Sequence, residues 1–243
     1  MPPSSSASTR IEPVSDRDER LLDRPIWSAL TTSHRHLAEG GARALRYPVD
    51  MTPFADMIDM SAESFAALGD LMASSQVVAL FTPEPVDVPA GFKVVLAESG
   101  DQMIGSPADC PLRDAEIVTL GKADVPAMTA LTTLTKPGPF AARTHELGTF
   151  LGIRAGGELV AMTGERMKPG KFVEMTAVCV HPDYRGRGYA QALLAAVARR
   201  IEARGEVPFL HVFSNNTSAI ALYERQGMRT RRRLHVTAFM KQG

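Results

Sequence analysis

The stretch from residue 177 to residue 205, AVCVHPDYRGRGYAQALLAAVARRIEARG, constrains the fold more than any other part of this chain. An apolar strand runs into a loop with two glycines, and a long amphipathic helix begins directly after the loop. The apolar stripe of that helix consists of Ala190, Leu193, Leu194, Val197 and Ile201, and Gly205 supplies its stop. Backbone N–H groups at the start of a helix lack partners within the helix and lie at the positive end of its dipole. The succession therefore predicts an α/β fold with a phosphate-binding loop at residues 185–190.

The glycines and arginines of this loop support the prediction. Gly186 and Gly188 let the backbone approach a ligand closely, and Arg185 and Arg187 place positive charge beside it. The alternative interpretation is a solvated loop with two surface arginines. The spacing fits neither the nucleotide P-loop, G-x-x-x-x-G-K-[ST], nor the dinucleotide fingerprint, G-x-G-x-x-G.

The loop spacing Arg185-x-x-Gly188-x-Ala190 instead resembles the R/Q-x-x-G-x-G/A signature of the GCN5-related N-acetyltransferase (GNAT) superfamily. The resemblance covers residues 114–240 and is nearest to the FR47-like subgroup, which is related to the glycine acyltransferases. It implies the α/β GNAT fold, in which a mixed central sheet is splayed at the cofactor site and flanked by helices.

A second run resembles another motif of the family, Asn216-x-x-Ala219-x-x-Leu222-Tyr223-x-x-x-Gly227. In the family this asparagine lies near the pantetheine arm of acetyl-CoA and this tyrosine near its sulfur. The resemblance thus implies acetyl-CoA as cosubstrate, with no metal. It assigns the following residues to acetyl-CoA binding: Val178, Cys179, Val180, Arg185, Gly186, Arg187, Gly188, Tyr189, Ala190 and Asn216.

Amine acetylation also needs a base. An amine at neutral pH is mostly protonated, and it cannot attack a thioester until a proton leaves. Glu174 lies on the strand before the loop, where histone-acetylating members of the family carry their base. Partial burial beside Phe172 and Met175 is expected to raise its pKa. The other interpretation is a strand-end glutamate on a solvated face.

Tyr223 is the expected acid, because a phenol can hydrogen-bond or protonate the thiolate that leaves. The alternative is a helix tyrosine packed in the core. By resemblance, a backbone N–H between Val178 and Val180 stabilises the oxyanion that the attack generates. That use requires a sheet that opens after this strand, and a β-bulge is the expected device.

Other reactive side chains are weaker candidates. Cys179 is expected to point away from its strand neighbours and has no activating residue near it in sequence, so a covalent cysteine mechanism is not expected. His34 and His36 are two residues apart, which on a helix directs them to nearly opposite faces, so they are not expected to bind a metal. By resemblance, His145 and Glu146 are expected at the acceptor pocket.

Composition argues against several classes of function. The 243 residues include 27 Lys plus Arg and 27 Asp plus Glu, and a neutral chain is poorly suited to coat nucleic acid or an acidic membrane. The basic run over residues 229–233 is expected to be a solvated strand face, or to meet an acidic partner or the 3′-phosphate of the cosubstrate. No run of apolar residues is long enough for a membrane helix. The two cysteines, Cys110 and Cys179, favour a reducing cytoplasm.

Three regions are expected along the chain. A flexible leader spans residues 1–24, an α/β region that could be a degenerate second copy of the fold spans 25–110, and the GNAT domain spans 111–243. Strands are expected at residues 77–81, 92–96, 116–120, 149–154, 158–167, 172–180 and 207–213, and residues 228–240 are expected to add a last strand or a pair of strands. Helices are expected after Ser61, between Asp124 and Lys136, over 140–147, after the glycine loop, and over 218–226.

The sequence therefore predicts an N-acetyltransferase that moves an acetyl group from acetyl-CoA to a primary amine in a ternary complex. The amine belongs to a small molecule or a peptide, and neither nucleic acid nor membrane is an expected partner. Monomer and homodimer both stay open. The alternative function is a catalytically inactive acetyl-CoA-binding sensor or interaction module, because the cofactor loop and the acid–base pair are separable features.

Overall fold

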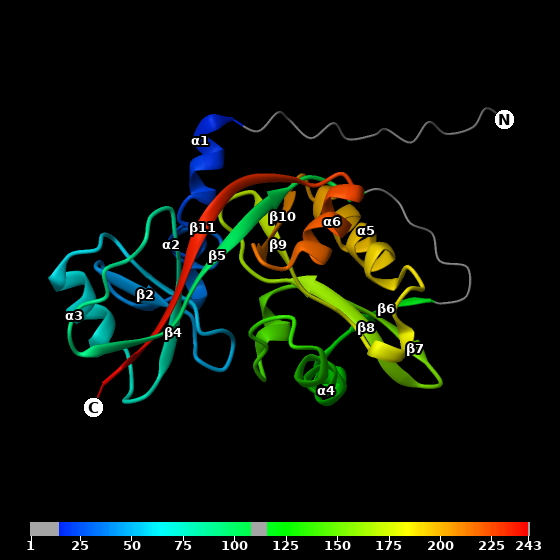
Figure 1. Cartoon of the computed structure of the whole chain (residues 1–243), viewed down its shortest axis with the longest axis horizontal. Helices are drawn as coiled ribbons and strands as arrows, with labels where there is room; N and C mark the ends of the chain where they lie inside the picture. The colour runs from blue at the N-terminus through cyan, green and yellow to red at the C-terminus, as the bar shows by residue number, and fades with distance from the viewer. Residues whose placement is uncertain (1–14, 108–115, 243) are drawn as a thin grey trace.

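The computed structural model describes residues 15–107 and 116–242 (Figure 1). Its strands are β1 (Glu39–Gly40), β2 (Ala44–Arg46), β3 (Ala55–Met57), β4 (Val77–Thr82), β5 (Phe92–Ile104), β6 (Ile117–Leu120), β7 (Phe150–Ala155), β8 (Glu158–Glu165), β9 (Phe172–Val180), β10 (Val207–Phe213) and β11 (Arg229–Lys241). Its α-helices are α1 (Asp16–Glu19), α2 (Pro25–Thr31), α3 (Ala62–Asp70), α4 (Val125–Thr135), α5 (Tyr189–Glu202) and α6 (Thr217–Arg225). Short 3-10 helices are η1 (Arg20–Leu22), η2 (Arg35–Leu37), η3 (Lys122–Asp124), η4 (Thr144–Leu147) and η5 (Pro182–Tyr184).

A mixed central sheet organises the molecule. Its strand order is β4-β11-β5-β10-β9-β8-β7-β6, and β9 and β10 run parallel while the other neighbouring strands are antiparallel. A small antiparallel sheet, β1-β2-β3, lies beside its β4 end. The architecture confirms the expected α/β fold with a mixed sheet and flanking helices.

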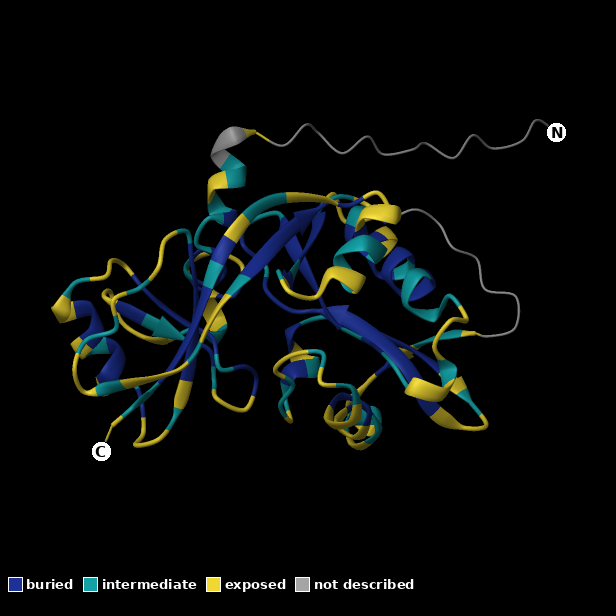
Figure 2. Cartoon of the chain, viewed as in Figure 1, coloured by how far each residue is buried: buried dark blue, intermediate teal, exposed yellow. Residues whose placement is uncertain are grey.

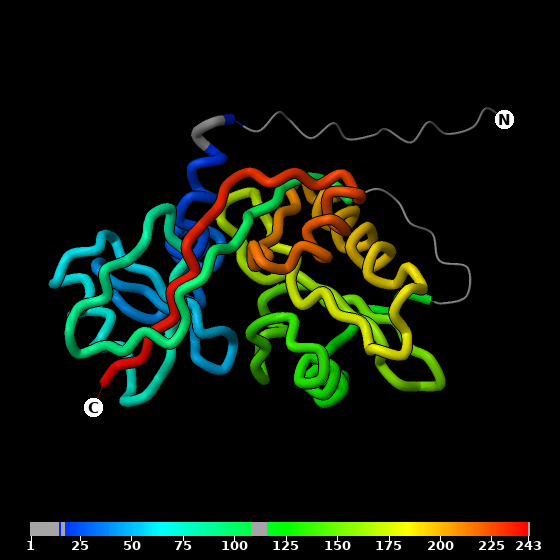
Figure 3. The backbone as a smooth tube through the Cα atoms, in the orientation of Figure 1, coloured from blue at the N-terminus to red at the C-terminus, as the bar shows by residue number. Residues whose placement is uncertain are grey.

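The central sheet extends across the expected boundary at residue 110, because β5, which ends at Ile104, is part of the same sheet as strands that follow the boundary. Strand β5 is inserted between β10 and β11, and it pairs with β11 along nearly its whole length. Figures 1 and 3 show β5 and β11 as a long arched ribbon that joins the part of the molecule containing α3 to the part containing α5 and α6. The region 25–110 therefore contributes two strands, β4 and β5, to the same sheet as the GNAT-like region.

Helices α5 and α4 cover opposite faces of the sheet. On β7, Leu151 and Ile153 pack in the core beneath α5, whereas Phe150 packs in the core beneath α4. This alternation follows from the strand period of two. Figure 2 shows that burial is concentrated in the middle strands of the sheet and along the inward side of α5.

Helices α2 and α3 cover the two faces of the sheet at β4. Ala79 and Phe81 pack with α2, and Val78 and Leu80 pack with α3. The predicted start of α3 is confirmed, since the Ser61 side chain accepts a hydrogen bond from the Ser64 N–H at 3.3 Å.

Some expected boundaries differ from the structure. The flexible leader does not reach residue 24, because the Leu22 side chain is fully buried with Ile104, Phe172, Val207 and Phe209. Beyond residue 96, β5 continues to Ile104 because its last residues pair with β10, which sequence periodicity does not reveal. The helix expected over 140–147 is only the 3-10 turn Thr144–Leu147. Cys110 lies outside the described residues.

The basic run at the start of β11 is paired within the chain. Arg231 bonds Glu19 at 3.2 Å and Asp23 at 2.9 Å, and Arg233 bonds Asp101 at 2.9 Å. The Arg231 side chain is only 11% exposed, so a fully solvated face is wrong for this residue. The two ion pairs of Arg231 dock the N-terminal helical turns onto the central sheet, whereas the pair of Arg233 with Asp101 joins β11 to β5. Over residues 15–107 and 116–242, no helix combines the length and the apolar character needed to cross a bilayer.

Candidate active site

A cavity of about 520 Å³ lies between the end of β9, the start of α5 and helix α6. It is lined by Thr135, Val178, Cys179, Val180, Tyr184, Arg185, Gly186, Gly188, Tyr189, Ala190, Gln191, Asn216, Ser218, Ala219, Leu222 and Tyr223. The structure thus brings together nine of the ten residues expected to bind acetyl-CoA, with Arg187 as the exception, and places the expected acid beside them.

The cavity forms because β9 and β10 separate. Their parallel register covers three pairs, Phe172 with Val207, Val173 with Pro208 and Glu174 with Phe209. Beyond these pairs both strands continue, β9 to Val180 and β10 to Phe213, without further pairing between them. The opening predicted after this strand is therefore present, and it leaves one edge of β9 facing the cavity.

A β-bulge turns the end of β9. The register with β8 shifts between Met162 and Gly164, and Ala177 has a left-handed φ of +51°. Val173 packs on the α5 side of the sheet, but Ala177 and Cys179, which strict alternation would place on that side, pack on the α4 side. The expected bulge is thus confirmed, and it directs Val178 and Val180 toward the cavity.

The glycine loop supplies the other wall. Gly186 and Gly188 both have a φ of +77°, a conformation that favours glycine. Gly188 is the N-cap of α5 and offers no side chain to bond the first N–H groups of the helix. The N–H groups of residues 188–191 consequently lack intrahelical partners and lie at the mouth of the cavity, as an anion site requires.

The two loop arginines differ in their surroundings. Arg185 is exposed and lines the cavity, and within the described part of the chain no side-chain partner of it is found. Arg187 does not line the cavity. Its guanidinium lies 4.8 Å from the centre of the Tyr184 ring, and it donates to the Asp183 carbonyl at 3.4 Å. Direct contact of Arg187 with a ligand in the cavity therefore requires a different side-chain rotamer.

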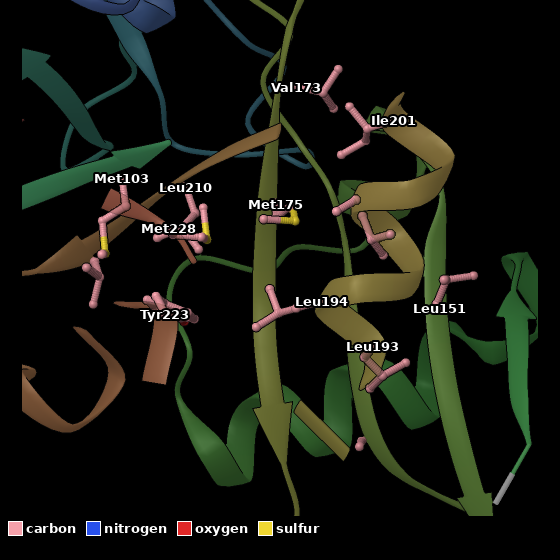
Figure 4. Close-up of a cluster of buried hydrophobic side chains, with 14 of the residues drawn as sticks. Met103, Leu151, Val173, Met175, Leu193, Leu194, Ile201, Leu210, Tyr223 and Met228 are labelled. Atoms are coloured by element: carbon pink, nitrogen blue, oxygen red, sulfur yellow. The ribbon is translucent and has the colours of Figure 1, made fainter. Parts of the chain in front are cut away.

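Tyr223 is buried on α6, and its ring packs with Met103, Leu210 and Met228 (Figure 4). Burial raises the pKa of Tyr223 to about 12, so its hydroxyl keeps its proton at neutral pH. Asn216 caps the same helix, because its side chain accepts a hydrogen bond from the Ala219 N–H at 3.2 Å. The Tyr223 side chain thus packs in the core, as one interpretation of the sequence expected, and it also lines the cavity.

Glu174 lies in different surroundings from those expected. It is fully buried and does not line the cavity. Arg166 donates to both carboxylate oxygens, at 2.7 and 2.8 Å, and His211 Nδ1 lies 2.8 Å from Oε1. Burial by itself raises the pKa of Glu174, but the charge and hydrogen bonds of Arg166, together with His211, outweigh it and lower the pKa to about 2. The expected increase of the Glu174 pKa and the alternative of a solvated strand face are therefore both wrong. The sequence of β9 alone does not reveal that Arg166 and His211 are the partners of Glu174.

Comparison with known proteins agrees with this geometry. A family model described as "Acetyltransferase (GNAT) family" matches residues 123–228. A solved GNAT-family protein from Novosphingobium aromaticivorans is 39% identical, with a TM-score of 0.84, over 92% of this chain and 99% of that one. The chain belongs to the GNAT family.

More distant relatives match parts of this GNAT chain. The N-alpha-acetyltransferase RimI of Mycobacterium tuberculosis is 36% identical over 108 residues, 39% of this chain and 66% of the relative. An acetyltransferase of Yersinia pestis is 44% identical over 48 residues, 19% of this chain and 33% of the relative. The matches thus span less than two thirds of these curated relatives. A GCN5-related N-acetyltransferase from Kribbella flavida, 16% identical with a TM-score of 0.61 over 90% of this chain and 95% of that one, shares the fold.

Cys179 of this GNAT chain lines the cavity as a buried free thiol. Burial raises the pKa of Cys179 to about 11, although hydrogen bonds with Thr135 and Met162 oppose the increase. A thiol with this pKa is almost entirely protonated at neutral pH, so the structure agrees with the absence of a covalent cysteine step.

Several cavity residues were not expected from the sequence. Thr135 ends α4, and Gln191, Ser218 and Leu222 lie on α5 and α6. Helical periodicity could have placed Leu222 beside Ala219 and Tyr223. No sequence signal places Thr135 at the cavity, because its position there depends on how α4 packs across the sheet.

The histidines singled out from the sequence lie elsewhere. His34 is buried, and its Nδ1 lies 2.9 Å from the Tyr47 hydroxyl. Within residues 15–107 and 116–242, no three His, Cys, Asp or Glu side chains are grouped so as to hold a metal. Neither His145 nor Glu146 lines the cavity, and Glu146 bonds Arg143 at 2.8 Å. The expected contact of these two residues with an acceptor stays a prediction.

Proposed function

We propose that this GNAT chain is an N-acetyltransferase that transfers the acetyl group of acetyl-CoA directly to a primary amine in a ternary complex. One observation carries the proposal: a single cavity joins the unpaired edge of β9, the uncapped start of α5 and the Tyr223 ring. Acetyl-CoA is a pyrophosphate linked to an amide-containing arm and a thioester. These three groups match, in order, the helix start, the free strand edge and a buried phenol.

The residues divide the binding work. The N–H groups of residues 188–191 and the Arg185 side chain would hold the pyrophosphate. The edge from Val178 to Val180 would bond the pantetheine amides as an added strand and supply an N–H to the oxyanion. The narrower likeness to the glycine acyltransferases stays a prediction, because the comparisons reach only the family.

In the transfer, the amine nitrogen bonds to the acetyl carbon, the carbon–sulfur bond breaks, the amine loses a proton and the sulfur gains one. Tyr223 is proposed to serve the sulfur. A free thiol has a pKa of about 8.5, and the pKa of Tyr223 is about 12. Complete proton transfer from Tyr223 to a thiolate is therefore unfavourable in this environment, and the phenol acts chiefly by hydrogen-bonding the leaving sulfur.

Glu174 as the direct base stays a prediction. Its pKa of about 2 makes it a weak base, and both of its oxygens are bonded to other side chains. A site with a weak base favours amines that are already partly uncharged. Roughly a tenth of an α-amine is neutral at pH 7, against less than a thousandth of a lysine-type amine. We therefore propose an α-amine acceptor, which agrees with the N-alpha-acetyltransferase named among the relatives.

The test is thiol release from acetyl-CoA across an amine panel, with a longer-chain thioester beside it. Each dipeptide with a free α-amine is paired with an Nα-blocked lysine peptide of the same length. Faster release with the free α-amine supports the proposal, and faster release with the blocked lysine peptide contradicts the acceptor class. If acetyl-CoA binds but no amine releases thiol, the binding-module alternative holds. If calorimetry detects no binding of acetyl-CoA, the proposed function is wrong.

A further inference from the structure

A hydrogen bond between two side chains crosses the parallel strands where their backbone pairing ends. Glu174 is the last residue of β9 that pairs with β10, and its partner in the register is Phe209. His211 comes two residues later on β10, on the same face as Phe209. Its Nδ1 lies 2.8 Å from Glu174 Oε1, and both side chains are nearly inaccessible, with 5% and 0% exposed. The pair thus joins the strands at the point from which they diverge.

We propose that His211 is a positioning residue, and that the Glu174–His211 bond, here called the strand clasp, sets how far β9 and β10 open at the cofactor cavity. The clasp lies at the apex of the opening, so a small change in its length becomes a larger change at the far end of the cavity. The proposal rests on the function proposed above for its binding readout.

Contacts with the N-terminal region determine which ring nitrogen of His211 carries the hydrogen. Gln102 on β5 donates its amide N–H to the Leu22 carbonyl at 2.9 Å, and its carbonyl accepts from Arg231 at 3.0 Å. Because these partners orient the amide, its nitrogen must also be the donor toward His211 Nε2, 3.0 Å away. His211 then carries its hydrogen on Nδ1, and this N–H donates a hydrogen bond to Glu174 Oε1.

The other end of the clasp is held from the same region. Arg166 binds both oxygens of Glu174, and its guanidinium lies over the Phe54 ring, 4.5 Å from the centroid. The His211 ring packs against Phe81, with ring centroids 4.6 Å apart. Leu22, Phe54, Phe81 and Gln102 all precede residue 110, so the region before the family match supports the residues that control the cavity.

The test replaces His211 without emptying its space. H211F keeps a ring between its aromatic neighbours but cannot bond Glu174. H211N keeps a donor at the position of Nδ1. Q102M leaves His211 in place and removes the donor that fixes its tautomer, together with the Gln102 bonds to Leu22 and Arg231. S64A is the matched control. Ser64 lies on α3, far from the clasp; it is fully buried, and its hydroxyl donates a hydrogen bond to Asp59 at 2.6 Å.

Calorimetry of acetyl-CoA binding is expected to show the Kd raised tenfold or more in H211F, about threefold in Q102M, and within twofold of the unmodified protein in H211N and S64A. If H211F does not fold, Q102M against S64A decides the matter. An unchanged Kd in folded H211F, or equal losses in H211F and S64A, overturns the proposal.

Hydrogen exchange in the absence of any ligand separates the two proposals. The amides of residues 175–180 are expected to exchange at least threefold faster in H211F than in the unmodified protein and at unchanged rates in S64A. If acetyl-CoA fails to bind the unmodified protein, the proposed function fails, and the exchange rates still decide whether His211 holds the strands. Equal exchange in H211F and the unmodified protein contradicts the clasp.

Discussion

Replacing Arg166 by methionine is expected to destabilise the protein strongly. The Arg166 and Glu174 side chains are 8% and 0% exposed, and the guanidinium binds both carboxylate oxygens. Removing the arginine leaves a buried carboxylate with His211 as its remaining side-chain partner. Breaking a buried ion pair from one side costs about 3–5 kcal/mol, because the charge left behind is uncompensated. We expect R166M to lower the free energy of unfolding by that amount.

The pH dependence gives a second measure of the same pair. The pKa of Glu174 is lowered from 4.5 to about 2, so the native state favours the ionised form. A group of this kind contributes stability above its unfolded pKa and loses it as the pH falls toward its folded pKa. The contribution is on the order of 3 kcal/mol and disappears between about pH 4.5 and pH 2. In R166M this acid loss is expected to shrink, since burial then acts against the ionised carboxylate.

Urea denaturation of the unmodified protein, R166M, E174Q and the double variant R166M/E174Q measures both effects. The double variant is expected to be more stable than R166M alone, because glutamine leaves no unpaired charge in the core. The reasoning is refuted if R166M costs less than about 1 kcal/mol, or if the double variant is less stable than R166M at pH 7.

Three further predictions concern separate parts of the molecule. Y223F is expected to lower kcat by at least tenfold while leaving the Kd of acetyl-CoA within threefold, and an unchanged kcat would contradict a role at the sulfur. A177G is expected to be neutral or to stabilise the protein by up to about 1 kcal/mol, because the φ of +51° strains alanine, whereas A161G, on a strand without positive φ, is expected to destabilise it in urea titrations. Burial, with smaller contributions from Lys168 and His36, lowers the pKa of His34 from 6.5 to about 4. The full free energy of unfolding is therefore present above pH 6.5 and falls as the pH approaches 4, by about 2 kcal/mol at pH 5, because the unfolded chain binds the proton first. H34Q is expected to lack that loss in urea titrations at pH 7.5 and 5.

Local sequence determined the elements around the site well. The bounds of β9 and β10 were predicted correctly, since each is an apolar run closed by a proline or a polar turn. The start of α5 and the opening after Glu174 also followed, the first from the glycine loop and the second through the family resemblance.

The surroundings of single charges could not be predicted in the same way. Glu174 meets Arg166 and His211, and His211 meets Gln102. These residues lie on four different segments, so their contacts depend on how the sheet is ordered. For this reason the pKa of Glu174 is lowered in the structure, whereas the sequence predicted that burial raises it. Similarly, Arg231 of β11 forms ion pairs with Glu19 and Asp23, which lie more than 200 residues earlier in the chain.

The insertion of β5 between β10 and β11 bears on how this protein can be divided. A cut at residue 110 would remove a strand from inside the sheet and leave two facing rows of unsatisfied backbone groups, which invite association with other chains. The GNAT half is therefore not a detachable module in this chain. The complete sheet requires strands from both fragments. Co-expression of residues 1–110 with 111–243 is therefore expected to give a folded complex, whereas neither fragment is expected to fold alone.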